Sequence, residues 1–294
     1  MSASQVPAWR DFYEAAWAYR AEFMRSKIRG GETDPYRIIK LFEAHERKYS
    51  FTLRNGESIV ERKTWPVDIY GETPAGVPAL RGTSLRGKTL RVPFHARDHL
   101  HDFIIDYIDE NGPYDCILEL GCGYGRALFE IFYGGGPSNI PYFGGELTQS
   151  GVAIAQELAA LRPEMKATFF RFDHLQPDLG IIPSVDRALV YTMHSIEQVA
   201  LIDPSFFAVA AGIAKDVTGL HFEPFGYQLG ETGPVTKDHQ KFMQERGWNQ
   251  NFAVALAQAM QRYGLKSDYT VTEQFLPSDW QNPTSLTIWR SAAA

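Results

Sequence analysis

The stretch "LELGCGYGRAL" (118–128) decides the fold, because an apolar run ends there in three glycines and a helix-forming run follows. Gly121, Gly123 and Gly125 permit a tight turn and let a ligand approach the backbone closely. A dinucleotide-binding loop would have the spacing G-x-G-x-x-G. Here the glycines alternate, and Glu119 stands at the end of the strand, where its charge would repel a pyrophosphate. This carboxylate instead suits a cationic ligand, such as one that carries an ammonium group.

The segments after this loop alternate between strand-like and helix-like patterns. This order is typical of βαβ units and predicts a mostly parallel sheet covered on both faces. The expected strands are 116–120, 141–147, 167–173, 187–193, 218–225, 268–276 and 285–290, and the expected helices are 126–133, 151–162, 204–216 and 238–263. The last two strands can pair as an antiparallel hairpin. The sequence therefore predicts an α/β protein with a Rossmann-like sheet of seven strands.

The N-terminal part of the chain has a different pattern. Residues 8–50 are expected to be helical, with an aromatic-rich stripe on one face (Phe12, Ala16, Tyr19 and Phe23) and Tyr13 and Trp17 beside it. This stripe is either part of the core or an aromatic lid over a ligand. Residues 51–94 contain Gly and Pro breaks typical of loops, and a helix is expected over 96–111. We therefore predict a mainly helical extension at 1–95 that covers the active site, followed by the sheet domain at 96–294.

The composition argues against nucleic-acid and membrane partners. The chain has 294 residues, of which 44% are hydrophobic, and its net charge of −6 lacks the basic excess of a nucleic-acid binder. No stretch approaches the roughly 20 apolar residues of a membrane span, and the N-terminus lacks the apolar core of a signal peptide. The two cysteines, Cys116 and Cys122, fit a reducing compartment. We expect a cytoplasmic protein with a small-molecule substrate, and a homodimer is compatible with the sequence.

Acidic residues end the next two expected strands. Glu146 lies 21 residues after Gly125, where a carboxylate can accept hydrogen bonds from both hydroxyls of a ribose. Asp173 and His174 end the third strand, where they could bond an adenine amine. Together with the glycine loop and the terminal hairpin, these residues resemble the class I S-adenosylmethionine-dependent methyltransferases over residues 115–290.

This resemblance implies S-adenosylmethionine as the cofactor and a methyltransferase sheet as the fold. It also assigns the residues that would contact the cofactor. They are Glu119, Gly121, Cys122, Gly123 and Gly125 for the methionine part, Glu146 for the ribose, and Leu147, Asp173 and His174 for the adenine.

Two further strands end in a histidine that an acid follows, in "YTMHSIEQV" and "GLHFEPFG". Because neighbouring strands lie ~4.8 Å apart, His194 and His221 would face each other at the edge where open α/β sheets bind ligands, and could share one ion. Glu197 or Gln198 could add an oxygen ligand, a set that suits Zn²⁺, Fe²⁺, Co²⁺ or Ni²⁺. The alternatives are a general base at His194, a helix cap at Glu197 and a structural histidine at His221.

The segments T-x-H-S-I-E-Q and H-F-E-P resemble those of the 2-oxo acid C-methyltransferases. This resemblance implies methylation at C3 of a small 2-oxo acid in secondary-metabolite biosynthesis, with 5-guanidino-2-oxopentanoate as a candidate substrate. It also implies a divalent metal, held by His194, Gln198 and His221, that polarises the keto oxygen and stabilises an enolate. The enolate carbon would then attack the sulfonium methyl group.

Proton removal at C3 needs a base, and the substrate carboxylate needs a cation. The candidate catalytic residues are His194, Glu197, Tyr191 and Arg97, with His174, Arg91 and the histidines of "FHARDHLHD" (94–102) as alternatives. His95 and His99 would share a helix face but His101 would not, which argues against a separate metal site there.

Two other functions stay open at this stage. One is a metal-independent O- or N-methyltransferase of a small metabolite, with His194 as the general base. The other is a catalytically idle cofactor-binding protein that serves as a partner subunit. The intact set of Glu119, Glu146 and the histidines argues against an idle protein.

Overall fold

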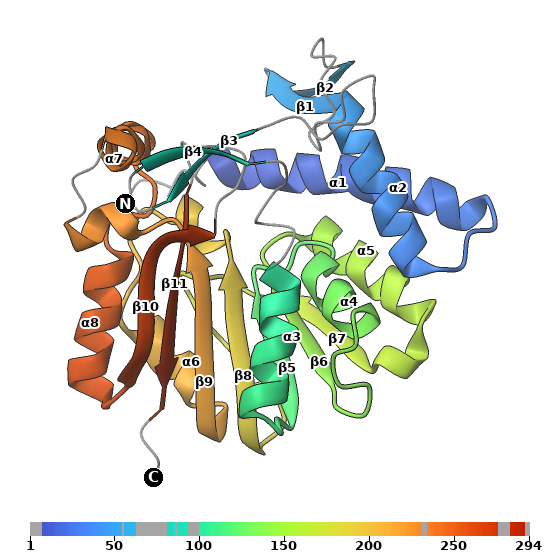
Figure 1. Cartoon of the computed structure of the whole chain (residues 1–294). Helices are drawn as coiled ribbons and strands as arrows, with labels where there is room; N and C mark the ends of the chain where they lie inside the picture. The colour runs from blue at the N-terminus through green and yellow to red at the C-terminus, as the bar shows by residue number, and fades with distance from the viewer. Residues whose placement is uncertain are drawn as a thin grey trace, which may run out of the picture.

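A mixed sheet of seven strands forms the centre of the part of the chain that the structure describes (Figure 1). The computed structural model describes residues 8–54, 56–62, 81–85, 88–92, 100–230, 234–275 and 283–291. The strands of the sheet are β5 (Cys116–Leu120), β6 (Tyr142–Glu146), β7 (Ala167–Arg171), β8 (Val185–Met193), β9 (Ala214–Glu223), β10 (Lys266–Phe275) and β11 (Thr284–Arg290).

The order of these strands is β10-β11-β9-β8-β5-β6-β7. The strands from β5 to β9 run parallel, whereas β11 lies between β9 and β10 and pairs antiparallel with both. The predicted fold class is therefore confirmed, including the final hairpin that inserts one antiparallel strand into the sheet.

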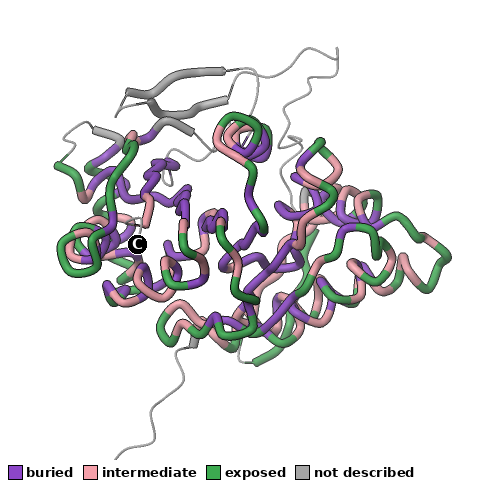
Figure 2. The backbone as a smooth tube through the Cα atoms, turned by 90° about the horizontal axis from the view of Figure 1, so that it is seen from below, coloured by how far each residue is buried: buried purple, intermediate pink, exposed green. Residues whose placement is uncertain are grey.

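Helices cover both faces of the sheet. On one face lie α3 (Leu100–Asn111), α4 (Arg126–Tyr133) and α5 (Gln149–Ala160), and on the other lie α6 (Ser205–Ala211) and α8 (Phe252–Tyr263). Successive strand residues alternate between the two layers, so that Ile117 packs in the first core and Leu118 in the second. Figure 2 shows the buried strands inside helices whose outer sides are exposed. No helix in the described ranges has the length and apolar character that a membrane crossing needs.

The N-terminal helices lie above the sheet domain. α1 (Ala8–Arg29) crosses over the carboxyl ends of the parallel strands, and α2 (Pro35–Lys48) starts beside α4 and rises away from the sheet (Figure 1). Two hairpins follow, β1 (Tyr49–Arg54) with β2 (Glu57–Arg62) and β3 (Arg81–Leu85) with β4 (Lys88–Val92). The predicted helical character of 8–50 is confirmed as two helices. The predicted domain boundary at residue 95 lies outside the described residues.

Polar contacts fasten α1 to the sheet domain. Arg10 forms an ion pair with Asp173 at 2.5 Å, just after β7. Glu14 accepts the first two backbone N–H groups of α5 at 2.9 Å, and thereby caps that helix. Arg25 binds both carboxylate oxygens of Glu157 in α5. Asp173 comes just after β7, and the start of α5 comes just after β6. The contacts of Arg10 and Glu14 with these segments therefore hold α1 over the ends of those strands.

Two predicted helices differ from the structure. The helix expected at 204–216 ends at Ala211, because β9 already begins at Ala214. The long helix expected at 238–263 is two helices, α7 (Pro234–Arg246) and α8, with a break between them. Gly247 and Asn249 have φ angles of 65° and 41° in that break, values that a right-handed helix cannot accommodate. Short 3-10 turns are η2 (Pro163–Met165), η3 (Ile196–Gln198) and η4 (Gly226–Leu229).

The substitution Gly219→Ala should destabilise the sheet. A Cβ at Gly219 would lie 2.2 to 2.5 Å from atoms of the buried Trp289 ring, which sits opposite it in register. Such overpacking costs about 1–3 kcal/mol, so chemical denaturation should give a free energy of unfolding lower by that amount. In the control variant Gly180→Ala, the new Cβ would approach only the Asp178 carboxylate, at 3.3 Å on an exposed loop. Equal stability of the two variants would contradict the close packing at Gly219.

Candidate functional site

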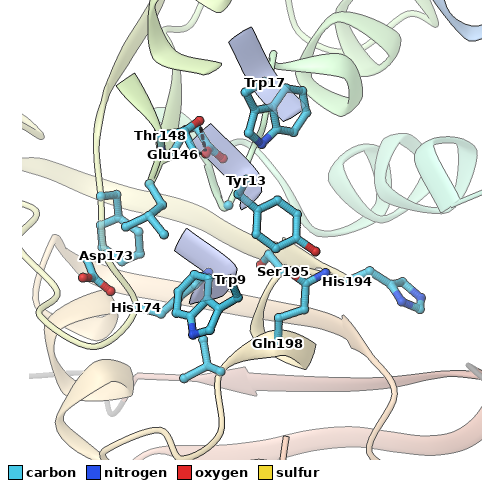
Figure 3. A pocket seen from close by; sticks show the side chains of 14 residues that line it. Trp9, Tyr13, Trp17, Glu146, Thr148, Asp173, His174, His194, Ser195 and Gln198 are labelled. Carbon is cyan, nitrogen blue, oxygen red and sulfur yellow. Dashed lines mark hydrogen bonds between the residues drawn. The ribbon is translucent and has the colours of Figure 1, made fainter. Parts of the chain in front are cut away.

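A cavity opens beneath α1 at the carboxyl ends of the parallel strands (Figure 3). Its walls come from α1, the glycine loop and the segments that follow β6, β7 and β8, namely Trp9, Tyr13, Trp17, Gly121, Glu146, Leu147, Thr148, Phe172, Asp173, His174, His194, Ser195, Gln198 and Val199. The empty space at this site amounts to about 680 Å³, which includes space open to solvent. It lies where open α/β sheets bind their ligands.

The alternating glycines form the loop after β5, and Gly121 of this loop lines the cavity. Gly121, Gly123 and Gly125 have φ angles of 86°, 57° and 79°, in the left-handed region that strains other residues. A Cβ at Gly121 would also lie 2.6 Å from the hydroxyl oxygen of Ser195, and one at Gly123 would lie 2.6 Å from the ring of Trp17. The glycines are therefore required both for the turn and for the close approach of neighbouring side chains.

Glu146 links the glycine loop to the turn after β6. Its carboxylate accepts the Gly123 N–H at 3.0 Å and both the N–H and the hydroxyl of Thr148, at 2.8 and 2.7 Å. The side chain is buried, and burial raises the pKa of Glu146 above its usual value. A carboxylate offers about four acceptor positions, and the described residues occupy three of them. Because Glu146 lines the cavity, a ligand hydroxyl could donate to the remaining position.

One end of the cavity is lined by the three residues that the sequence assigns to the adenine, Leu147, Asp173 and His174, together with Phe172. Asp173 is already occupied, by Arg10 and by the Leu175 N–H at 2.9 Å. By contrast, the two buried ring nitrogens of His174 have no hydrogen-bond partner among the described residues. Burial lowers the pKa of His174 to about 4, so a neutral imidazole with unused hydrogen-bonding capacity borders the cavity.

A second cavity lies beside the first, and Trp17 and Gly121 line both. Glu119 borders this second cavity, with its carboxylate buried and accepting a hydrogen bond from the Tyr191 hydroxyl at 3.2 Å. Burial raises the pKa of Glu119 to about 8, which makes the site favourable for a cation. The adjoining cavities suit an elongated ligand with one end at Glu119 and the other at His174.

His194 lies just after β8 and carries a φ of 50°. Its Nδ1 lies 2.7 Å from Oε2 of Glu197, and its Nε2 lies 2.6 Å from the hydroxyl of Thr284. Since a carboxylate accepts hydrogen bonds, these contacts assign the proton to Nδ1 and leave Nε2 as the accepting nitrogen. Figure 3 shows the imidazole directed away from the Glu146 and Asp173 end of the cavity.

Glu223 supports the turn that carries these groups. Its buried carboxylate accepts the backbone N–H groups of Ser195, Ile196 and Glu197 at 3.0 to 3.2 Å. Burial and the charge of Glu197 raise the pKa of Glu223 to about 8. Glu223 therefore caps η3, the role that the sequence offered as an alternative for Glu197, while Glu197 contacts His194 instead.

His221 does not face His194, and this corrects the predicted metal set. Its Nδ1 bonds the hydroxyl of Thr192 at 2.9 Å, and its Nε2 accepts the indole N–H of Trp289 at 2.7 Å. The alternation of β9 directs His221 to the layer of α6 and α8, where burial lowers its pKa to about 3.

The predicted metal ligands His194, Gln198 and His221 are thus not brought together. Both nitrogens of His221 have protein partners, so it cannot ligate an ion without breaking them. In the ranges that the structure describes, no group of three His, Cys, Asp or Glu side chains is arranged to hold a metal. The residues present do not fit the shared ion, and no step below passes through one.

The other predicted catalytic residues have varied positions. Tyr191 lies opposite Glu119 on the neighbouring strand β8 and donates a hydrogen bond to it. Burial raises the pKa of Tyr191 well above its usual value, so its hydroxyl stays protonated as a structural partner of that acid. His101 forms an ion pair with Glu130 at 2.6 Å. Arg97, His95 and His99 lie outside the described residues, and the side chain of Arg91 is not described.

The aromatic residues that border the cavity are not those of the predicted stripe but the neighbouring Tyr13 and Trp17, together with Trp9, which the sequence prediction missed. Their four-residue spacing is a signal that could have identified this face. Tyr13 bonds Gln198, and burial beside the Glu197 charge raises its pKa to about 12. His239 of α7 is fully buried, with no hydrogen-bond partner among the described residues, and burial lowers its pKa to about 4. No sequence pattern distinguishes this histidine.

Solved structures that resemble the chain are methyltransferases. Magnesium protoporphyrin IX methyltransferase from Synechocystis PCC 6803, with bound SAH, is 16% identical, has a TM-score of 0.46, and aligns over 67% of this chain and 84% of that one. Geranyl diphosphate C-methyltransferase from Streptomyces coelicolor A3(2) is 14% identical, has a TM-score of 0.44, and aligns over 67% and 78%. No protein-family model and no curated protein matches the chain. The functional argument therefore depends on the site itself.

The substitution Glu223→Gln should loosen the turn that carries His194. The substituted amide keeps one acceptor oxygen but turns an N–H₂ toward backbone donors, and a buried donor left without a partner costs about 1–3 kcal/mol. We expect denaturation to report a loss in the free energy of unfolding of that size. Glu164→Gln, at an exposed carboxylate, is the matched control and should change stability by less than about 0.5 kcal/mol. A Glu223→Gln variant as stable as this control would contradict the capping role.

Proposed function

We propose that the protein is an S-adenosylmethionine-dependent methyltransferase that acts on a small molecule. The observation that carries this proposal is the pair of adjoining cavities around the glycine loop, with Glu119 at one end and His174 at the other. An elongated ligand with a cationic group and a nitrogen-rich ring complements such a site. The sheet order and the position of the site at the carboxyl edge are compatible with this function.

The residues present fit S-adenosylmethionine in charge and in hydrogen bonding. Glu119 would hold the ammonium group, and the open acceptor position of Glu146 would hold a ribose hydroxyl. The unpaired nitrogens of His174 would contact the adenine, which Leu147 and Phe172 would cover. When bound, S-adenosylmethionine supplies an electrophilic methyl group on a sulfonium sulfur.

His194 is the group that we propose as the general base. Glu197 holds Nδ1–H, which fixes the ring and leaves Nε2 free of a proton, while the Thr284 hydroxyl donates to Nε2. A substrate would take the place of that hydroxyl and give its proton to Nε2. The resulting imidazolium is stabilised by the Glu197 carboxylate. A base of this kind contributes typically 10²–10⁴-fold to a rate.

For the substrate we propose a 2-oxo acid methylated at C3. A proton on the carbon beside the keto group is acidic enough for a positioned base to remove, and the electron pair of the broken C–H bond then attacks the methyl carbon as the bond from that carbon to sulfur breaks. The support for this substrate is the likeness of the T-x-H-S-I-E-Q and H-F-E-P segments. His239, a buried imidazole without a hydrogen-bond partner among the described residues, is the candidate to bond a substrate oxygen.

O- or N-methylation of another small metabolite is the second candidate function. The observation that favours it is the His194–Glu197 pair itself, which needs no metal to deprotonate an oxygen or nitrogen acid. Aromatic side chains of α1 cover the cavity in either case, because methyl transfer from a sulfonium is protected by the exclusion of water.

The substitution Glu146→Gln tests the cofactor. Loss of the charged acceptor should weaken binding of S-adenosylhomocysteine at least tenfold, because each charge-assisted hydrogen bond contributes about 1.5–3 kcal/mol. Isothermal titration calorimetry measures this, with Glu164→Gln as the matched control that should bind like the natural protein. Unchanged affinity in a folded Glu146→Gln variant would remove Glu146 from the site. No binding by the natural protein would refute the proposed function.

The substitution His194→Asn tests the base. Asparagine tolerates the positive φ of this position but cannot act as a base. We expect it to lower turnover by 10²–10⁴-fold while S-adenosylhomocysteine still binds. The assay incubates the protein with a panel of 2-oxo acids and S-adenosylmethionine in deuterated water, and measures methylated product and C3 hydrogen exchange with solvent by mass spectrometry.

The natural protein should both exchange and methylate at C3, and the variant should do neither at the original rate. Full turnover in the variant would exclude His194 as the base. Methylation of oxygen or nitrogen acceptors, with no reaction of any 2-oxo acid, would replace the first candidate function by the second.

A further inference from the structure

Three hydroxyl groups of described residues line the first cavity, those of Tyr13, Thr148 and Ser195. The Thr148 hydroxyl donates to the Glu146 carboxylate at 2.7 Å. The Ser195 hydroxyl donates to the last backbone carbonyl of β5 at 2.8 Å. Both of these protons are thus held by strong protein acceptors, whereas the Tyr13 hydroxyl has a neutral partner, the side-chain amide of Gln198.

The contacts of α1 fix the position of Tyr13. Arg10 and Glu14, which flank it in the sequence, bind Asp173 and the first backbone N–H groups of α5. The Tyr13 ring also packs edge-on against the ring of Trp9, with the centroids 6.3 Å apart. The hydroxyl is therefore carried by an anchored helix, as the preorganised donors of active sites are.

The Tyr13 hydroxyl lies on the side of the cavity that holds the proposed base. Its partner Gln198 belongs to η3, where the Gln198 amide nitrogen lies 3.5 Å from Oε1 of Glu197. Glu197 in turn contacts Nδ1 of His194 at 2.7 Å. Figure 3 shows the hydroxyl directed away from Glu146 and toward the segment that carries His194. Because Tyr13 and His194 line one cavity, a small molecule there can contact both.

Enolisation of a 2-oxo acid places negative charge on the keto oxygen. As His194 removes the C3 proton, the electron pair of the C–H bond forms a double bond between C2 and C3, and the π pair of the carbonyl moves to oxygen. A preorganised donor at that oxygen stabilises the charge, and such donors contribute about 10²–10³-fold to a rate. A phenol suits this role, because it stays protonated at neutral pH and can donate.

We propose that Tyr13 is a catalytic residue whose hydroxyl donates a hydrogen bond to the keto oxygen of the substrate and to the enolate oxygen that forms from it. This inference rests on the proposed function, because an enolate forms only if the substrate is a 2-oxo acid. When the carbonyl forms again, C3 attacks the methyl carbon, and the electron pair of the broken bond stays on sulfur. The proton leaves His194 for solvent, so Tyr13 keeps its own proton throughout.

Two reactions of the same 2-oxo acid separate enolisation from methyl transfer. With S-adenosylhomocysteine in deuterated water the protein can only exchange C3 hydrogen, whereas with S-adenosylmethionine it also transfers the methyl group. Tyr13→Phe should slow both reactions about 10²–10³-fold, because both pass through the enolate that loses its donor. The phenylalanine keeps the ring, so calorimetry should show an unchanged affinity for S-adenosylhomocysteine.

Tyr19→Phe is the matched control, because it removes a hydroxyl of the same helix that bonds His45 at 2.5 Å, outside the cavity. It should leave both rates unchanged. Exchange at the natural rate in Tyr13→Phe would overturn the inference, whether or not methylation slows, since the enolate would then form without this donor. A loss of S-adenosylhomocysteine affinity as large as the loss of rate would also overturn it and make Tyr13 a cofactor-binding residue.

The natural protein tests the function on which the inference rests. If it neither exchanges nor methylates any 2-oxo acid while it binds S-adenosylhomocysteine, the first candidate function is refuted, and the inference with it. Full activity of the natural protein combined with full activity of Tyr13→Phe would overturn the inference alone.

Should Tyr13→Phe fail to fold, as judged by circular dichroism, 3-fluorotyrosine at position 13 keeps both the ring and the hydroxyl. Oxalate, a planar dianion that resembles the enolate of a 2-oxo acid, should then shift the ¹⁹F resonance in the presence of S-adenosylhomocysteine, because the fluorine lies next to the donating hydroxyl. A resonance that saturating oxalate leaves unchanged would overturn the inference.

Discussion

The hydrogen bond from the Gly123 N–H to the Glu146 carboxylate organises the site. It joins the loop between β5 and α4 to the turn between β6 and α5, across 23 positions of sequence. The same carboxylate accepts both donors of Thr148, whose hydroxyl caps α5 through the Gly151 N–H. One buried acid thus fixes the positive-φ loop, the first turn of α5 and the open acceptor position in the cavity. Replacing it disturbs structure and binding together, which is why its variant must be compared with a folded control.

The same turn after β6 holds α1 in place, and α1 in turn supplies one wall of the cavity. The amides that Glu14 caps are those of the helix that Thr148 begins, and the ion pair of Arg10 ends at Asp173 beside the cavity. These contacts put the ring of Trp17 against Gly123, between the two cavities. The ion pair of Arg10 with Asp173 therefore links the position of α1 to the end of the cavity that Asp173 borders.

The sequence predicted those features that a local pattern determines. The alternating apolar runs gave the strands and their order of appearance, and the spacing of Gly121, Gly123 and Glu146 identified the loop and its acid. It did not predict the break between α7 and α8, because the turn depends on φ angles that Gly247 and Asn249 adopt only in the packed chain. Nor did it identify His239, because no local pattern shows that α7 buries this imidazole.

The two histidines show why sequence context alone could not assign a metal. Thr192 and His221 are paired residues of neighbouring parallel strands, so both point to the layer of α6 and α8. His194 lies beyond the end of β8, where its positive φ turns the side chain out of the strand's alternation and toward Glu197 and Thr284. A histidine near the end of each of two neighbouring strands therefore does not place the two side chains on one face. The same turn that separates His194 from His221 gives it a carboxylate partner, and this pairing is what makes base catalysis without a shared ion chemically reasonable here.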